Sequence, residues 1–153
     1  MSLMVALQPS LGRAVVVGGG RVATRKVHAL AEAGFAVTVV APFVASEIRG
    51  LVAVLVVERP FEASDIDGAA LIFACTNDRA VNRAISELAR ARGVPVLVAD
   101  ARAESTFFSV ATLRVADLLV GVSTGGSGPG RAMRVRDRIA FALASGAFEE
   151  PDQ

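Results

Sequence analysis

The sequence predicts an α/β fold in which a doubly wound parallel sheet is covered by helices. Apolar runs of strand length alternate with amphipathic segments of helical period, and the connections between them are short. A cluster of three glycines, Gly18–Gly20, joins the first apolar run directly to the first helical segment. This alternation favours a parallel sheet, because parallel strands need a crossover segment between them. The 153 residues suffice for one domain, or for one domain with a small appendage.

The individual elements follow from hydrophobic period and from their end signals. Gly34 and Gly93 stand where two helices are expected to end, since glycine adopts the left-handed conformation of a helix stop. Thr76-Asn77-Asp78 is a turn that also caps the helix after it. The expected strands are Ala14–Val17, Phe35–Val40, Val52–Val57, Ala69–Ala74 and Pro95–Ala99, and the expected helices are Arg21–Ala33, Val44–Gly50 and Asp78–Arg92.

The pattern changes after Asp100. Two extended runs, Phe107–Val115 and Asp117–Ser123, surround a short turn and predict a β-hairpin. A glycine-rich loop and a helix, Arg131–Ala144, follow. We therefore expect a nucleotide-binding part over residues 1–104 and a hairpin-and-helix part over residues 105–153.

Composition excludes several classes of protein. The chain is 53% apolar with a mean hydropathy of +0.53, yet no apolar run reaches the roughly 18 residues of a membrane helix. Its start lacks the pattern of a signal peptide, and Cys75 has no cysteine to pair with, so we expect a cytoplasmic protein without a membrane partner. A net charge of +1 and the lack of Tyr and Trp argue against a nucleic-acid partner. With His28 as the single histidine, a zinc site or a Ser-His-Asp triad is disfavoured.

The glycine cluster fits a dinucleotide fingerprint. Gly18-x-Gly20-x-x-Ala23 lies between a strand and a helix, where the main chain of Gly18, Gly20, Arg21 and Val22 would face a pyrophosphate. This context predicts a Rossmann-like fold with NAD as cofactor, although a tight turn without a ligand is the alternative. No acidic residue follows the second strand to hold a ribose, and Pro42 and Phe43 stand there instead. No arginine follows directly either, which favours NAD over NADP.

Polar residues follow two further strands at the same predicted edge. Asp100 comes after the fifth strand, where a carboxylate can accept a proton or bind a metal, or merely cap the next turn. Thr76 and Asn77 follow the fourth strand and are candidates to contact the cofactor, although helix capping alone explains them. Cys75 is interpreted as a small core residue, because no histidine is placed to activate it.

A second candidate site lies near the C-terminal helix. Thr124 with Gly125, Gly126 and the glycines after them could form a second anion-binding loop. Arg131, Arg134 and Arg138 recur on one helical face and suit a substrate with several carboxylates. A solvated helix face explains the same spacing.

With these residues identified, the chain resembles the precorrin-2 dehydrogenase and sirohydrochlorin ferrochelatase family, the N-terminal module of siroheme synthases. The resemblance runs from about Leu11 to Ile139. Its landmarks are Val17–Lys26, Val37–Pro42, Thr76–Asp78 with Asn82, Val98–Asp100 and Val122–Gly126. The chain departs from the family pattern at Ser105–Ala111, Gly128 and Met133, on the side expected to hold the substrate.

The resemblance implies a function. It implies a homodimer that uses NAD to oxidise precorrin-2, a tetrapyrrole, to sirohydrochlorin, and that in many members also inserts Fe²⁺. The family's aspartate after the fifth strand aligns with Asp100 and would be the general base and the metal contact. The family's phosphorylatable serine aligns with Thr124. One alternative is a nucleotide-sensing regulatory domain, which would retain Gly18, Gly20 and Ala23 but have no use for Asp100 or the arginine helix. Another is a family member that retains the fold without catalysis.

Overall fold

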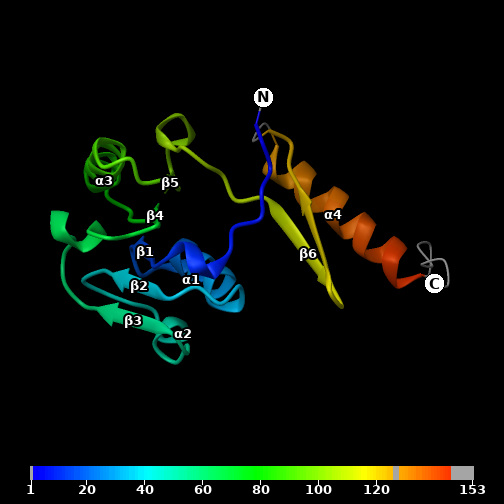
Figure 1. Cartoon of the computed structure of the whole chain (residues 1–153), viewed down its shortest axis with the longest axis horizontal. Coiled ribbons are helices and arrows are strands. Elements are labelled where there is room, and N and C mark those ends of the chain that lie inside the picture. Colours follow the sequence, from blue (N-terminus) through cyan, green and yellow to red (C-terminus); the bar gives the residue numbers. More distant parts are fainter. Residues whose placement is uncertain (1, 126–127, 146–153) are drawn as a thin grey trace. The chain divides into compact units, whose positions relative to one another are not determined.

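Five parallel strands form the central sheet of the protein in a computed structural model that describes residues 2–125 and 128–145 (Figure 1). The strands are β1 (Ala14–Val17), β2 (Val37–Val40), β3 (Val54–Val57), β4 (Leu71–Ala74) and β5 (Val96–Val98). Their order in the sheet is β3-β2-β1-β4-β5, with every pair parallel. The helices of this part are α1 (Arg21–Glu32), α2 (Ser46–Arg49) and α3 (Arg79–Ala91). The predicted Rossmann-like α/β fold is therefore confirmed.

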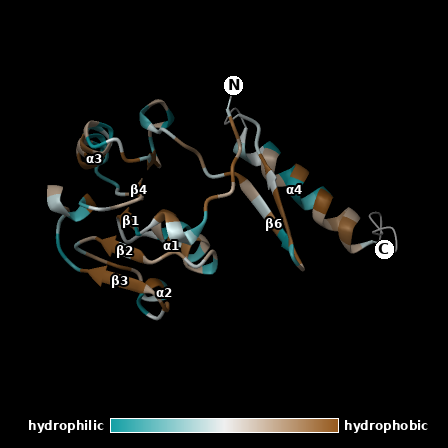
Figure 2. Ribbon diagram, viewed as in Figure 1, coloured by the Kyte–Doolittle hydropathy of each residue, from teal (hydrophilic) through white to brown (hydrophobic). Residues whose placement is uncertain are grey.

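The two faces of the sheet bury different side chains of the same strand. Ala14 and Val16 of β1 pack in one cluster with Val27 of α1, whereas Val15 and Val17 pack in a second cluster with Ile85 of α3. Because neighbouring strand residues point to opposite faces, a strand covered on both sides is apolar throughout. Figure 2 shows mostly hydrophobic colour along β2 and β3, although β3 is the edge strand and its Leu55 is 62% exposed.

Several elements begin later than the sequence predicts. The β2 strand starts at Val37 rather than Phe35, because the Phe35 N–H still bonds the Leu30 carbonyl oxygen at 3.0 Å behind Gly34. The β3 strand starts at Val54 because Ala53 has a positive φ of 63°, which interrupts extended backbone. These differences arise from local hydrogen bonds and torsions that the hydrophobic pattern does not encode.

Helix ends follow the predicted signals. Gly34 and Gly93 have φ values of 87° and 68°, as expected for left-handed residues after a helix. The predicted helix Val44–Gly50 is shorter, since α2 spans only Ser46–Arg49. Its first residues are held elsewhere, because the Ala45 N–H donates to the carbonyl oxygen of Gly19 at 2.9 Å.

The chain divides into two compact units. The sheet unit comprises Val5–Phe107, and the hairpin unit combines the described parts of Met1–Met4 and Phe108–Gln153. The hairpin unit contains an antiparallel pair, β6 (Ala111–Val115) and β7 (Leu118–Val122), and α4 (Pro129–Ala144) contacts both strands. The predicted hairpin and helix are present, although β6 begins four residues later than the expected run. The division at residue 104 and the role of each part remain predictions.

None of the helices in the two described ranges, 2–125 and 128–145, is long and apolar enough to cross a membrane.

The carboxyl ends of the sheet strands lie at one edge. Val17, the last residue of β1, is in register with Val40 of β2 and with Ala74 of β4. The chain leaves β1 toward β2 on one side, and β4 lies on its other side. A ligand site in an open α/β sheet is expected outside the strand ends at such a point, where the strand order reverses.

Candidate functional site

A cavity of about 690 Å³ opens at this edge of the sheet unit. Its size falls within the range of roughly 300–1,000 Å³ that small-molecule sites occupy. It is lined by the segments that follow β1, β2 and β4 and by the connection after β3, namely Val17–Val22, Val40–Phe43, Pro60, Phe61, Cys75–Asp78 and Val81. Segments that are far apart in sequence therefore meet where the fold predicts a ligand.

The three glycines of the first turn have different steric roles. Gly18 has a φ of 121°, and a Cβ there would lie 2.5 Å from the carbonyl oxygen of Cys75. A Cβ on Gly19 would lie 2.0 Å from the carbonyl oxygen of Phe43. Gly20 has ordinary extended torsions, and a Cβ there would meet nothing within 4 Å. The fold itself thus requires Gly18 and Gly19, whereas the space at Gly20 is free for a ligand.

The N-terminus of α1 forms one wall of the cavity. Gly20 is its N-cap, so no side chain bonds the free N–H groups of the first turn, and Arg21 and Val22 line the cavity. Free N–H groups and the positive end of the helix dipole together attract an anion. Ala23 does not line the cavity, because it is fully buried against the sheet. Its small side chain permits the close helix–sheet packing that the third position of the fingerprint requires.

The segment after β4 is held by a buried asparagine. Asn82 is completely buried on α3; its amide donates to the Thr76 carbonyl oxygen at 3.0 Å and its Oδ1 accepts from the Thr76 N–H at 3.1 Å. Asp78 caps α3 by accepting from the N–H groups of Ala80 and Val81, at 2.8 and 3.2 Å. The predicted cap is confirmed, and these contacts hold Thr76 and Asn77 at the cavity wall.

The opposite wall is apolar. Pro42 and Phe43 line it after β2, and Phe43 is 75% exposed. Pro60 and Phe61 complete this wall, although no role was predicted for them from the sequence. Their position after a strand of the same parallel sheet was the signal that could have identified them.

Cys75 is buried at the base of the cavity. Burial raises the pKa of its thiol from an ordinary value of 9.0 to about 11, so the thiol is protonated and poorly nucleophilic at neutral pH. The same surroundings lower the pKa of Lys26 on α1, mainly because its ammonium group is desolvated. The interpretation of Cys75 as a buried small residue agrees with this environment.

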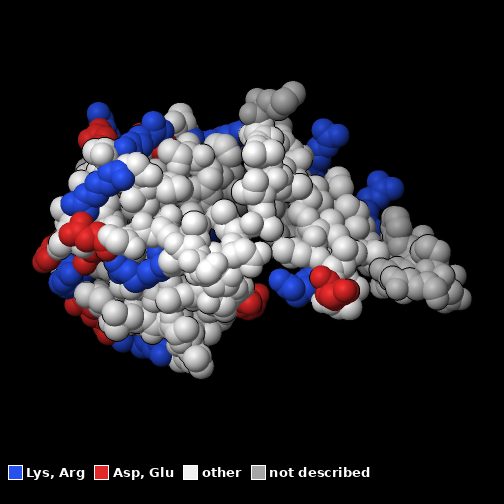
Figure 3. Space-filling view, in the orientation of Figure 1, with Lys and Arg blue, Asp and Glu red and all other residues white. Residues whose placement is uncertain are grey.

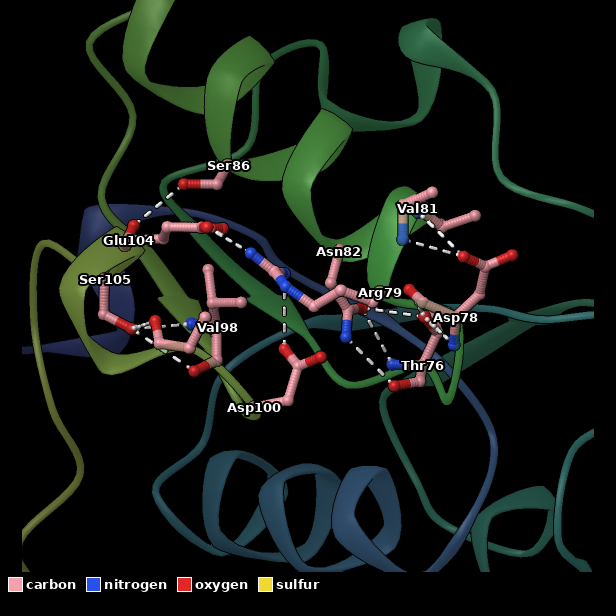
Figure 4. A network of polar contacts seen from close by, with 12 residues as sticks. Thr76, Asp78, Arg79, Val81, Asn82, Ser86, Val98, Asp100, Glu104 and Ser105 are labelled. Atoms are coloured by element: carbon pink, nitrogen blue, oxygen red, sulfur yellow. Dashed lines mark hydrogen bonds and ion pairs between the residues drawn. The ribbon is translucent and has the colours of Figure 1, made fainter.

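Asp100 lies two residues beyond β5 but does not line the cavity. Its carboxylate is 38% exposed and lies 3.6 Å from the guanidinium of Arg79, the first residue of α3 (Figure 4). Nothing in the local sequence around Arg79 separates it from an ordinary surface arginine, so no role was predicted for it.

The remaining predicted residues lie in the hairpin unit. Thr124 accepts a hydrogen bond from the Gly128 N–H at 3.2 Å, and Gly125 has a positive φ of 60°. Gly126 lies outside the described residues. The three predicted arginines of α4, at positions 131, 134 and 138, are exposed. Their contact with a substrate remains a prediction.

Charge is mixed on one face of the sheet unit, and the described residues contain no candidate metal cluster. On the face shown in Figure 3, basic and acidic side chains are interspersed over the sheet unit. Within residues 2–125 and 128–145, no three His, Cys, Asp or Glu side chains gather closely enough to hold a metal ion.

Comparison with known proteins agrees with this geometry. Residues 5–111 match the model of a family described as putative NAD(P)-binding. The chain belongs to this NAD(P)-binding family. Eight of the nine predicted cofactor-binding residues line the cavity of its Rossmann-like domain, namely Gly18, Gly20, Arg21, Val22, Pro42, Phe43, Thr76 and Asn77.

Similar proteins confirm the resemblance read from the motifs. A siroheme synthase of Pseudomonas entomophila is 42% identical over 141 residues, which are 88% of this chain and 30% of that protein. A siroheme synthase of Methylococcus capsulatus is 42% identical over 136 residues, 86% of this chain and 28% of that protein. A solved structure named SirC, precorrin-2 dehydrogenase, has a TM-score of 0.69 at 28% identity, covering 98% of this chain and 72% of that one. The chain thus spans less than a third of the length of these siroheme synthases.

Proposed function

We propose that this NAD(P)-binding protein oxidises precorrin-2 to sirohydrochlorin with NAD, as a dehydrogenase of siroheme biosynthesis. The observation that carries the proposal is the unfilled space at Gly20, above the uncapped N-terminus of α1. That space is needed for a pyrophosphate and has no purpose in packing. The likeness to a precorrin-2 dehydrogenase over nearly the whole chain supports the substrate class.

The residues present fit a dinucleotide. The N–H groups of Arg21 and Val22 would hold the pyrophosphate, and the wall of Pro42 and Phe43 would lie beside the adenosine. Bound NAD supplies an acceptor for hydride at its nicotinamide ring. Thr76, which is fixed by Asn82, and its neighbour Asn77 would contact the cofactor on the β4 side.

The protein's own residues would then handle the proton and the substrate. Oxidation of precorrin-2 removes a hydride and a proton, and Asp100 is the carboxylate proposed to accept the proton. The loop Thr124–Gly126 and the α4 arginines Arg131, Arg134 and Arg138 are proposed to bind the acetate and propionate groups of the tetrapyrrole.

The test is to mix the protein with precorrin-2 and NAD and to follow the absorbance of NADH and of sirohydrochlorin. Both should appear together, and Asp100→Asn should lower kcat by roughly 100-fold or more while NAD affinity stays unchanged. Asp67→Asn is the matched control, because Asp67 is also a surface carboxylate paired with an arginine, Arg92. Binding of NAD without either product would contradict the dehydrogenase and favour a nucleotide sensor or a non-catalytic relative.

The preference for NAD over NADP is a finer part of the proposal. Its support is that no arginine follows β2 directly to hold the 2′-phosphate of NADP, although Val40–Phe43 also lacks the carboxylate that usually holds the ribose of NAD. Equilibrium titrations with both dinucleotides test the preference, and tighter binding of NADP would overturn it.

Insertion of Fe²⁺ into sirohydrochlorin is proposed as a second step, with Asp100 as the residue in contact with the substrate metal. Its support is the resemblance at Val98–Asp100. Anaerobic mixing with sirohydrochlorin and Fe²⁺ should produce siroheme faster than the uncatalysed control. Equal rates with and without protein would remove this step.

The protein is proposed to form a cytoplasmic homodimer through the hairpin unit. Leu118 and Leu119 of β7 are 48% and 51% exposed, and Phe141 of α4 is 77% exposed. Contiguous exposed apolar patches mark association surfaces, and these side chains are proposed to form one. Light scattering should give twice the monomer mass, and Leu119→Glu should reduce it. A wild-type monomer at high concentration would contradict the dimer.

A further inference from the structure

Arg79 lies between two carboxylates that belong to different elements of the sheet unit. It is the first residue of α3, directly after the Asp78 cap. One of its guanidinium nitrogens bonds Glu104 of the short helix Arg102–Glu104, and another lies 3.6 Å from Asp100 (Figure 4). A planar guanidinium presents several donors in fixed directions, so one arginine serves both groups at once.

Hydrogen bonds to α3 and to β5 fix the backbone around Glu104. The Ser86 hydroxyl of α3 donates to the Glu104 carbonyl oxygen at 2.8 Å, and the Val98 N–H of β5 donates to the Ser105 hydroxyl at 2.9 Å. The second carboxylate oxygen of Glu104 is buried and has no hydrogen-bond partner within the described residues. Arg79 is therefore the cation that compensates this carboxylate, which fixes the guanidinium in turn.

The contact with Asp100 differs in kind. At 3.6 Å it is longer than a hydrogen bond, so it attracts the carboxylate without occupying its lone pairs. The Asp100 side chain remains 38% exposed. The carboxylate is thus oriented by a fixed positive charge while its oxygens stay available to a substrate.

We propose that Arg79 is the positioning residue for Asp100 and that Glu104 anchors Arg79. The inference rests on the proposed role of Asp100 in precorrin-2 oxidation. Arg79 itself does not line the cavity, so it acts through Asp100 rather than on the cofactor.

The kinetic test uses a double-mutant cycle. Arg79→Gln should lower kcat about tenfold or more and leave KM for NAD unchanged, and Arg79→Lys should recover part of the loss. Glu104→Gln should also lower kcat. The double variant should be no slower than Arg79→Gln, because both changes disrupt the same placement of the Arg79 guanidinium beside Asp100. The control is Arg83→Gln, one turn along α3, whose guanidinium pairs with exposed Glu87. An unchanged kcat in Arg79→Gln, or losses that multiply in the double variant, would overturn the proposal.

A second readout does not depend on turnover. In ¹⁵N-arginine spectra, the guanidinium of Arg79 should give resolved signals of restricted rotation, assigned by their loss in Arg79→Gln. Asp100→Asn should shift these signals, and Glu104→Gln should average them. If the wild-type protein does not oxidise precorrin-2, the proposed function is wrong, but the spectra still test the position of Arg79. Arg79 signals that are averaged in wild type, or unmoved by Asp100→Asn, would overturn the positioning role.

Discussion

A side chain at position 19 would collide with the main chain of Phe43. A Cβ on Gly19 would lie 2.0 Å from the Phe43 carbonyl oxygen and 2.7 Å from the Cα of Val44. The Gly19 carbonyl oxygen also accepts a hydrogen bond from the Ala45 N–H. The turn after β1 and the segment after β2 therefore touch backbone to backbone, and this contact shapes two walls of the cavity.

Replacing Gly19 tests this contact. Gly19→Ala should lower the free energy of unfolding by about 1–3 kcal/mol, because backbone atoms must move to admit the methyl group. Urea unfolding followed by circular dichroism measures the change. Wild-type stability in this variant would mean that the two segments separate easily.

Position 20 should respond in the opposite way. Gly20→Asp places a good helix cap in open space, so stability should be equal or higher, whereas a carboxylate there repels a pyrophosphate. We expect NAD affinity to fall at least about tenfold by calorimetry, a loss of about 1.4 kcal/mol or more. Gly50→Asp is the control, since Gly50 is also in open space but does not line the cavity. Unchanged NAD binding in Gly20→Asp would place the pyrophosphate elsewhere.

Asp78 should contribute to stability through its cap. Asp78→Ala removes the acceptor for two N–H groups of α3 and should cost about 1 kcal/mol. Asp78→Asn retains a side-chain oxygen and should cost less. Urea unfolding of both variants decides the point, and equal losses would show that charge rather than capping matters.

The raised pKa of the Cys75 thiol should make the free energy of unfolding fall at high pH. Its pKa is about 11 when folded and near 9.0 when unfolded, so only the unfolded thiol loses its proton between these values. The stabilising effect is fully present below pH 9 and is lost as pH rises toward 11, by about 2–3 kcal/mol. When each protein is compared with its own value at pH 7, the free energy of unfolding should decline less in Cys75→Ala than in wild type over this range. Parallel declines in both proteins would contradict the raised pKa.

Most of the cavity lining was predictable from the sequence, whereas the surroundings of Asp100 were predictable only in part. Gly18, Gly20, Thr76 and Asn77 follow strands of one parallel sheet, and such a sheet brings all its strand ends to one edge. Phe61 escaped prediction because its segment has no strong period. Arg79 escaped as well, because its partners are 21 and 25 positions away in sequence at Asp100 and Glu104.

The sequence by itself determined the sheet, the glycine turn and the helix caps, since these depend on local period and local torsions. Tertiary structure decided what each glycine does: Gly19 is required by packing against Phe43, whereas Gly20 leaves space for a ligand. It also decided that Ala23 packs in the core and that Arg79 lies between two carboxylates. These relationships join residues from separate strands and helices, so they exist only once long-range packing has brought the segments together.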